Sequence, residues 1–207
     1  MIRVLIVEDQ RMIREMLEQY LRRENGYNVC EALERAEYAP DYCFYHRIDL
    51  VIMDICTEGK MNGFEASAQI KQKKPNTKIV AVTSMLDSGF LECGRENGVD
   101  SMWYKDLSAE TLMSVIERTM KGESVYPDKV PEITIGHAVN YDFTKGEIRV
   151  LRLLVQGKTY KEIAAELNIS PDTVKEHVSN MLSKTGFKSK LQLTIEVVSK
   201  KMIVPNV

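Results

Sequence analysis

Acidic residues, a threonine and a lysine stand where short apolar runs of this sequence end. They are Glu8 and Asp9 after RVLIV, Asp54 after LVIM, Thr83 after KIVAV and Lys105 after SMWY. Carboxylates brought close together repel one another unless a hard cation such as Mg²⁺ holds their oxygens. A carboxylate beside Mg²⁺, with a hydroxyl and an ammonium nearby, is equipped to accept a phosphoryl group, and Asp54 is the expected acceptor.

The elements that must position these side chains alternate along residues 1–121. Apolar, β-branched runs predict strands at 3–8, 27–32, 49–54, 78–84 and 101–105, and stretches with a helical period predict helices near 10–23, 34–46, 63–73, 88–97 and 108–121. This alternation predicts a doubly wound α/β fold, in which helices cover both faces of a five-stranded parallel sheet. Ligands of such sheets bind at the carboxyl ends of the strands, where the acidic residues, Thr83 and Lys105 would meet.

Four short motifs carry these residues: VED (7–9), VIMD (51–54), VTS (82–84) and YKD (104–106). With them, residues 1–121 resemble the flavodoxin-like receiver domain of response regulators. The resemblance implies that a sensor histidine kinase supplies the phosphate. It also implies that the chain is a phosphoacceptor and no enzyme, apart from slow self-dephosphorylation.

The same resemblance assigns a role to each residue of the site. The implied metal ligands are Glu8, Asp9, Asp54 and the backbone carbonyl of Cys56. Thr83 is implied to move toward the phosphate, and Lys105 to pair with it. Mg²⁺ is therefore the cofactor that we expect for phosphorylation.

Two features depart from the receiver pattern. Met102 stands where the family usually has a tyrosine or phenylalanine, and Trp103 or Tyr104 would replace that aromatic only if the strand changed register. We therefore expect a methionine switch or weak coupling. The loop ICTEGKMNG (55–63) lacks the usual proline and reaches its Asn-Gly turn one residue late, which would alter kinase choice or phosphate lifetime.

Other doubly wound domains fit the sequence less well. No Gly-x-Gly-x-x-Gly follows the first predicted strand, and there is no glycine-rich lysine loop, so a flavin- or nucleotide-binding domain is disfavoured. A phosphatase with an aspartyl nucleophile commonly has a second aspartate two residues on. Cys56 stands at that position, which disfavours this enzyme as well.

Composition and charge suggest two domains in 207 residues. Residues 1–121 hold 16 basic and 20 acidic side chains, whereas residues 143–207 hold 11 and 6, so a polyanionic partner is expected on the basic tail. No apolar run is long enough to span a membrane and no secretory segment begins the chain, which predicts a cytoplasmic protein. The four cysteines form no Cys-x-x-Cys pair and are expected to be free, mostly buried thiols.

A linker is predicted between the domains, at residues 122–142. It contains prolines at 127 and 131 and has no sustained helical period. Val125, Tyr126 and Ile133 are expected to dock it partly, whereas His137 is expected to have no role.

Residues 143–207 predict an all-α domain of four helices, near 145–156, 160–167, 171–184 and 190–201. Their boundaries are marked by Thr144 with Glu147, Thr159 with Glu162, Ser170 with Pro171, and Ser189 with Gln192. Only residues 168–170 join the second and third helices, and Asn168 can adopt the left-handed conformation that so short a link needs. This is the helix-turn-helix arrangement.

The third of these helices has two contrasting faces. Its apolar side carries Val174, Val178, Met181 and Leu182, so the opposite side must face outward, into a major groove of double-stranded DNA. The expected base readers are Lys175, Glu176 and Ser179, with Asn180 reading adenine or holding a phosphate, and the expected phosphate contacts are Lys161, Thr173, His177 and Lys184. The alternative is an ordinary helical bundle with a solvated face.

The segments KEIAAELNIS (161–170) and TVKEHVSNML (173–182) make residues 143–193 similar to the LuxR-type DNA-binding domain. Together with the receiver, the chain resembles the NarL/FixJ family of two-component response regulators. This implies a phosphorylation-controlled transcription regulator that dimerises when phosphorylated, with RNA polymerase as a further expected partner. The last helix would place Leu191, Leu193, Ile195 and Val198 near a two-fold axis, although some of them must face the domain core.

Two other hypotheses remain open from the sequence. In one, an atypical receiver leaves the chain a constitutive DNA-binding regulator. In the other, the chain is a protein-interaction module whose output does not depend on DNA.

Overall fold

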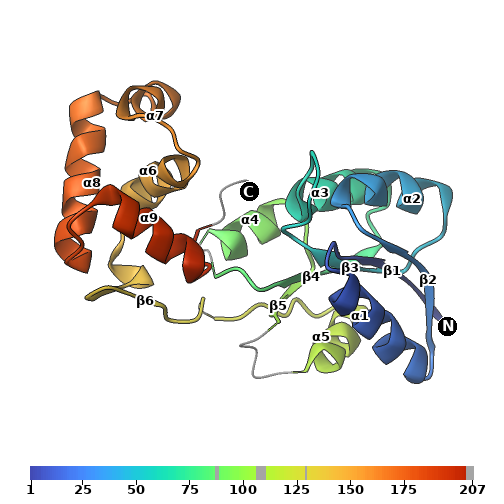
Figure 1. Cartoon of the computed structure of the whole chain (residues 1–207). Helices are drawn as coiled ribbons and strands as arrows, with labels where there is room; N and C mark the ends of the chain where they lie inside the picture. The colour runs from blue at the N-terminus through green and yellow to red at the C-terminus, as the bar shows by residue number, and fades with distance from the viewer. Residues whose placement is uncertain (87–88, 106–110, 129, 204–207) are drawn as a thin grey trace. The chain divides into compact units, whose positions relative to one another are not determined.

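The computed structural model describes residues 1–203 except 87–88, 106–110 and 129 (Figure 1). Two compact units make up the chain. The first comprises Met1–Ser84 and Gly89–Lys129, and the second comprises Val130–Val207 with Met85–Ser88. Each unit has its own apolar core.

The first unit is the predicted parallel sheet. Its strands are β1 (Ile2–Val7), β2 (Tyr27–Leu33), β3 (Leu50–Asp54), β4 (Lys78–Thr83) and β5 (Ser101–Tyr104), in the order β2-β1-β3-β4-β5. Its helices are α1 (Arg11–Arg23), the 3-10 turn η1 (Ala36–Tyr38), α2 (Ala39–Tyr45), α3 (Gly63–Lys73), α4 (Phe90–Glu96) and α5 (Leu112–Met120). Figure 1 shows α2, α3 and α4 on one face of the sheet and α1 and α5 on the other. The doubly wound fold predicted from the alternating pattern is confirmed.

The central strands are apolar along their whole length because helices cover both faces. Every residue of β3 is buried, including Asp54 at its end. β1 and β4 begin partly exposed and become fully buried toward their carboxyl ends. The acidic residues, Thr83 and Lys105 therefore lie at the ends of strands that the core holds in place.

Local signals in the sequence fix several boundaries, with one reinterpretation. Asn62 and Gly63, which the sequence suggested as a turn, form the start of α3. The Asn62 side chain accepts from the N–H groups of Phe64 and Glu65, and the backbone N–H of Asn62 donates to the Glu65 carboxylate. Gly122, with φ of 94°, follows α5 as predicted. The starts predicted for the helices at 88–97 and 108–121 lie outside the described residues.

The second unit contains a short hairpin of β6 (Thr134–Ile135) and β7 (Ala138–Val139), a 3-10 turn η2 (Asn140–Asp142), and four helices. These are α6 (Lys145–Val155), α7 (Tyr160–Leu167), α8 (Pro171–Thr185) and α9 (Lys190–Ser199). The capping boxes predicted at Thr144 and Thr159 are present, and the Ser170 and Ser189 side chains also cap their helices. The hairpin was not predicted, because its strands are too short to show a period.

Residues of the predicted linker belong to both units. Val125 packs against the core of the first unit, whereas Ile133 is buried in the core of the second. The Tyr126 hydroxyl donates to the backbone carbonyl of Val99 at 2.9 Å, within the first unit. The expected docking of all three residues is thus observed.

The structure also bears on the expected burial of the cysteines and on membrane-spanning helices. All four cysteines are free, but only Cys43 is buried, so the expectation of mostly buried thiols was wrong. Sequence hydrophobicity alone overestimated their burial: Cys30 lies on the edge strand β2, Cys56 follows β3 and Cys93 lies in the middle of α4, and all three are partly exposed. In the described part of the chain, no helix has both the length and the hydropathy required to cross a bilayer.

Candidate functional site

Three carboxylates meet at the carboxyl end of the sheet. Glu8 and Asp9 follow β1, and Asp54 ends the neighbouring strand β3. One oxygen from each lies within 4.8 Å of the others. Glu8 is 1% exposed and Asp54 5% exposed, whereas Asp9 lies more openly. The predicted cluster of these three acids is therefore present.

Lys105 is the cation bonded to this cluster among the described residues. Its Nζ lies 2.6 Å from Glu8 Oε2 and 2.7 Å from Asp54 Oδ2. Burial acts to lower the pKa of Lys105, but the attraction of Asp54 and Glu8 outweighs it and the pKa is raised. For Glu8, burial and the nearby charge of Asp54 raise the pKa although Lys105 opposes them. The ammonium is thus firmly charged, and the carboxylates still repel one another.

Backbone donors orient the carboxylates. The N–H of Cys56 donates to Asp54 Oδ1 at 3.1 Å, and the N–H of Glu58 donates to Asp9 Oδ2 at 3.1 Å. Carboxylate oxygens at this spacing, one of them accessible, are the donors that a hard divalent cation prefers. The residues present therefore fit Mg²⁺.

Thr83 lies on β4, the strand beside that of Asp54, and Met102 lies on β5, the next strand of the sheet. Thr83 ends β4 and is fully buried, and its backbone carbonyl accepts from the N–H of Lys105 at 2.9 Å. Met102 is 1% exposed and pairs with Ala81, and β5 keeps a continuous register with β4. Trp103 packs with the core on the sheet's other side, so neither it nor Tyr104 takes the position of Met102.

Two supporting residues gave little signal in the sequence. A Cβ on Gly63 would lie 2.5 Å from the backbone carbonyl oxygen of Asp54, so only glycine lets α3 begin this close to the site. Arg14 donates to the backbone carbonyls of Glu8 and Asp9 at 2.7 and 3.2 Å. The Asn-Gly pair in the sequence indicated that Gly63 has a special backbone position. The role of Arg14 follows from its contact with the end of β1, which no local sequence pattern shows.

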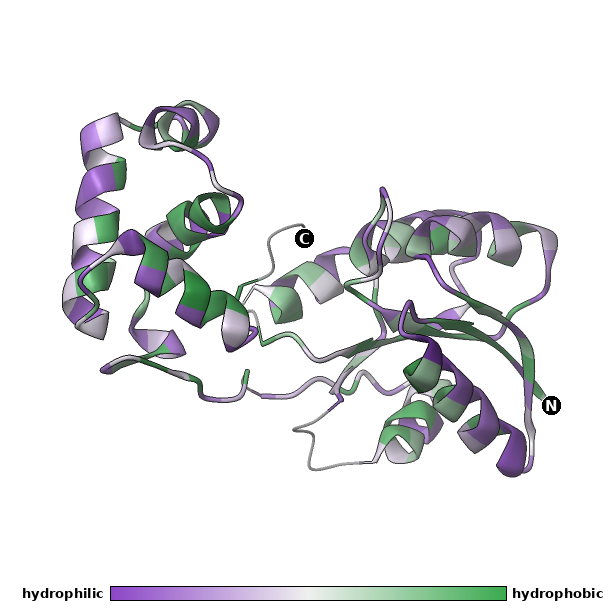
Figure 2. Cartoon of the chain, in the orientation of Figure 1, coloured by the Kyte–Doolittle hydropathy of each residue, from purple (hydrophilic) through white to green (hydrophobic). Residues whose placement is uncertain are grey.

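The helix-turn-helix of the second unit is formed by α7 and α8. Asn168 joins them with φ of 55° and ψ of 46°, the left-handed conformation predicted for it. Val174, Val178 and Met181 of α8 are buried. The predicted base readers all lie on the exposed side of the helix: Lys175, Glu176, Ser179 and Asn180. Figure 2 shows this side of α8 as hydrophilic and the side toward α6 as hydrophobic.

The predicted phosphate contacts have different surroundings. Lys161 is exposed, and the Thr173 hydroxyl lies 2.9 Å from Ser170 Oγ at the start of α8. The His177 ring packs against Gly146 at the start of α6. Lys184 is bonded inside the unit, with its Nζ 2.7 Å from Glu147 Oε2. This ion pair gives Lys184 a structural role, which its position in the sequence did not reveal.

The last helix has the mixed character expected of it. Leu193 and Val197 are buried in the core, whereas Leu191, Ile195 and Val198 are 66%, 60% and 40% exposed. The exposed three follow one another at intervals of four and three residues and therefore share one face of α9.

Comparison with known proteins agrees with both units. Residues 4–117 match the response regulator receiver domain, and residues 142–197 match the family of bacterial regulatory proteins named luxR. Response regulator protein VraR from Staphylococcus saprophyticus is 32% identical over 199 residues, with 94% of this chain and 95% of that protein covered. The same protein from Staphylococcus aureus strain Mu3 is 32% identical over 202 residues, with the same coverage.

Solved structures show similar folds. A structure of two RcsB dimers bound to two parallel DNAs matches with a TM-score of 0.62 at 20% identity, over 96% of this chain and 98% of that chain. A DNA-binding response regulator of the LuxR family from Staphylococcus aureus matches at 28% identity with a TM-score of 0.54, over 58% of this chain and 99% of that chain. The chain therefore belongs to the LuxR-family response regulators, which join a receiver domain to a LuxR-type DNA-binding domain.

Proposed function

We propose that this phosphorylation-controlled transcription regulator accepts a phosphoryl group on Asp54 from a sensor histidine kinase and then binds double-stranded DNA as a dimer. The observation that carries the proposal is the position of Asp54, whose carboxylate is bonded by the ammonium of Lys105 and lies beside the carboxylates of Glu8 and Asp9. Such a site stabilises the charge of a phosphoryl group only when a divalent cation is bound in addition to Lys105.

The transfer step uses the carboxylate of Asp54 as the nucleophile. An oxygen of Asp54 attacks the phosphorus of a phosphohistidine, an O–P bond forms, and the P–N bond breaks with its electron pair left on the imidazole nitrogen. That nitrogen then takes a proton. Lys105, 2.7 Å from Asp54 Oδ2, is placed to pair with the transferred group.

Glu8, Asp9, Asp54 and the Cys56 carbonyl would hold Mg²⁺, which when bound neutralises charge on the phosphoryl oxygens. The buried hydroxyl of Thr83, at the end of the adjacent strand, would turn to the new phosphate. That movement would change the packing of α4 and β5 and favour a second receiver conformation.

DNA recognition is assigned to the exposed side of α8. Lys175 would bond guanine, Glu176 would accept from cytosine, and Ser179 and Asn180 would complete the reading of base edges. Lys161, Thr173 and His177 would contact phosphates, and Lys184 would contribute only if it left Glu147. The exposed side of α9 would form the two-fold contact between DNA-bound protomers.

The remaining expectations follow from this role. The protein would act in the cytoplasm, where bacterial DNA and RNA polymerase are found, and would have no enzymatic turnover beyond slow loss of its own phosphate. A constitutive regulator is less well supported, because Glu8, Asp9, Asp54, Thr83 and Lys105 are all in place. A module that ignores DNA would leave the polar side of α8 unexplained.

The DNA-binding part is tested with an operator selected from random DNA. Lys175→Ala should weaken operator binding at fixed salt by about tenfold or more, because one good base contact contributes about 1–3 kcal/mol. Lys200→Ala, which removes an exposed lysine just after α9, is the matched control and should change affinity little. Equal effects of both substitutions would show that α8 does not read the sequence.

A further inference from the structure

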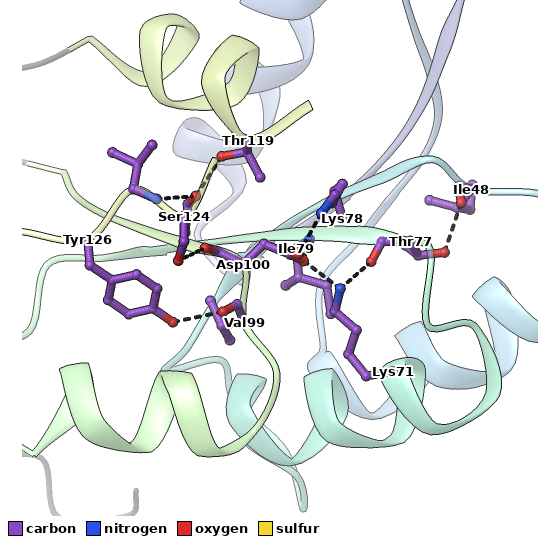
Figure 3. A network of polar contacts seen from close by, with 12 residues as sticks. Ile48, Lys71, Thr77, Lys78, Ile79, Val99, Asp100, Thr119, Ser124 and Tyr126 are labelled. Atoms are coloured by element: carbon purple, nitrogen blue, oxygen red, sulfur yellow. Dashed lines mark hydrogen bonds and ion pairs between the residues drawn. The ribbon is translucent and has the colours of Figure 1, made fainter. Parts of the chain in front are cut away.

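An extended segment after α5 lies along the outer edge of β5 and is bonded to it at several points (Figure 3). The N–H of Met102 donates to the carbonyl of Val125 at 2.9 Å, and the N–H of Val125 donates to Ser101 Oγ at 2.9 Å. The Ser124 hydroxyl donates to the carbonyl of Asp100 at 2.8 Å. The first residues of the linker are thus ordered by the receiver itself.

Tyr126 ends this segment, and its side chain lies between the start of β5 and α4. Its hydroxyl donates to the Val99 carbonyl at 2.9 Å, and the guanidinium of Arg95 lies 4.3 Å from the ring centroid. A Cβ on Gly94 would lie 3.0 Å from the Tyr126 hydroxyl oxygen and 3.1 Å from Met102 Cε. We call this surrounding of Val99, Gly94, Arg95 and Met102 the Tyr126 seat.

The Tyr126 seat adjoins the residues that would sense phosphate. Met102, which lines it, occupies the position where the receiver resemblance expects an aromatic residue. The strand of Met102 continues directly to Lys105, whose ammonium lies 2.7 Å from Asp54. One four-residue strand therefore joins the partner of the phosphoacceptor to the seat of the linker.

We propose that Tyr126 is the aromatic reporter of this receiver and latches the linker to β5 and α4 only while Asp54 is unphosphorylated. The inference rests on the proposed function of Asp54. When a phosphoryl group replaces the carboxylate as the partner of Lys105, β5 and α4 shift and the close fit at Gly94 is lost. The linker segment then leaves the edge of β5. By thermodynamic reciprocity, loss of the latch must also favour phosphorylation.

Hydrogen exchange in the full chain tests the release directly. The amides of Met102 and Val125, which are bonded in the latched state, should exchange about tenfold faster when Mg²⁺ and beryllium fluoride are added. Asp54→Asn should show no such change. Unchanged or slower exchange at these amides, in a sample whose Asp54 loop shows that beryllium fluoride has bound, would overturn the latch.

Substitutions test the reciprocal effect. Tyr126→Ala should raise the affinity for beryllium fluoride in the presence of Mg²⁺ by about tenfold or more. Tyr126→Phe, which keeps the ring and removes one hydrogen bond, should raise it by at most about fivefold. Tyr42→Phe is the matched control, because the Tyr42 hydroxyl also reaches the carbonyl of an edge strand residue, Cys30 of β2. If Tyr126 had a merely structural role, its substitution would lower the melting temperature and leave the affinity for beryllium fluoride unchanged.

The outcomes separate this inference from the proposed function. Faster exchange of the linker with no change in DNA affinity would support the latch and contradict the phosphorylation-controlled DNA binding. A change in DNA affinity with the linker still protected would do the reverse.

Discussion

The two ends of the receiver sheet hold similar side chains in opposite proportions. At the amino end, the carboxylate of Asp100 is bonded by Lys71 at 2.5 Å, by Lys78 at 3.0 Å, and by the N–H of Ile79 at 2.8 Å (Figure 3). At the carboxyl end, the carboxylates of Glu8, Asp9 and Asp54 lie together, and the ammonium of Lys105 is bonded to two of them, Glu8 and Asp54.

This difference in charge distinguishes the Asp100 cluster, which stabilises the fold, from the Asp54 cluster, which is suited to a reaction. The charge of Asp100 is fully matched, and this cluster also anchors β4 and β5. The charges at the other end are not matched, and burial together with the nearby charge of Asp54 raises the pKa of Glu8. Carboxylates in excess lower stability but leave a place for a cation.

The largest expected effect comes from removing the phosphoacceptor. Asp54→Asn should abolish incorporation of phosphate from phosphoramidate, because the amide is no nucleophile, and intact-mass spectrometry would show the missing adduct. The same change relieves repulsion with Glu8, so the free energy of unfolding should not fall. A phosphorylated Asp54→Asn protein would place the acceptor elsewhere.

At the amino end, replacing Asp100 should lower stability and leave phosphorylation intact. Asp100→Asn should lower the free energy of unfolding by about 3 kcal/mol, since it leaves two partly buried lysines without their partner. Urea denaturation measures the loss. Phosphate should still be incorporated, and a protein of normal stability would mean that the cluster contributes nothing to the fold.

A smaller effect is expected on the binding of Mg²⁺. Asp9→Asn removes an accessible charge of the site, and the affinity for Mg²⁺ should fall about tenfold, or 1.4 kcal/mol. Fluorescence of Trp103, the single tryptophan of the chain, provides the titration signal. Glu58→Gln, just beside the site, serves as the control, and an equal loss there would indicate a general charge effect.

The smallest effect concerns the second ion pair at the amino end. The Arg3 guanidinium nitrogen Nη2 lies 2.7 Å from Asp49 Oδ1, and this pairing lowers the pKa of the Asp49 carboxyl to about 2. Because this pKa is lowered by folding, the pair stabilises the protein above about pH 4 and the contribution is lost as the pH falls toward 2. Asp49→Asn should cost less than about 1 kcal/mol at pH 7, since the pair is partly exposed and screened.

Urea denaturation at several pH values measures this contribution. The difference in stability between the native chain and Asp49→Asn should narrow below pH 4. A difference that stayed constant down to pH 3 would contradict the linkage.

The sequence predicted the elements of the site because they are local. Buried strands appear as apolar runs, and the residue that ends each run lies at the carboxyl edge of a parallel sheet, which is why Glu8, Asp54 and Lys105 could be placed together. Helix starts were equally readable, since the Thr144 and Thr159 caps depend on residues three positions away.

Contacts between distant residues could not be predicted in this way. From the sequence, Lys184 is expected to be an exposed lysine on its helix. In the structure its ammonium is paired with the carboxylate of Glu147, 37 positions away. The need for glycine at position 63 follows from the approach of α3 to Asp54, and the seat of Tyr126 follows from the packing of α4 on β5. Such features depend on how elements meet, which periodicity and capping do not encode.

The most direct test of the account is the affinity for the selected operator at fixed salt, with and without Mg²⁺ and beryllium fluoride, the latter standing in for the phosphoryl group on Asp54. We expect the affinity to tighten by about tenfold or more, or 1.4 kcal/mol, and this change to disappear in Asp54→Asn. Equal affinity in both states, unchanged by Asp54→Asn, would contradict it and mean that this chain binds DNA constitutively.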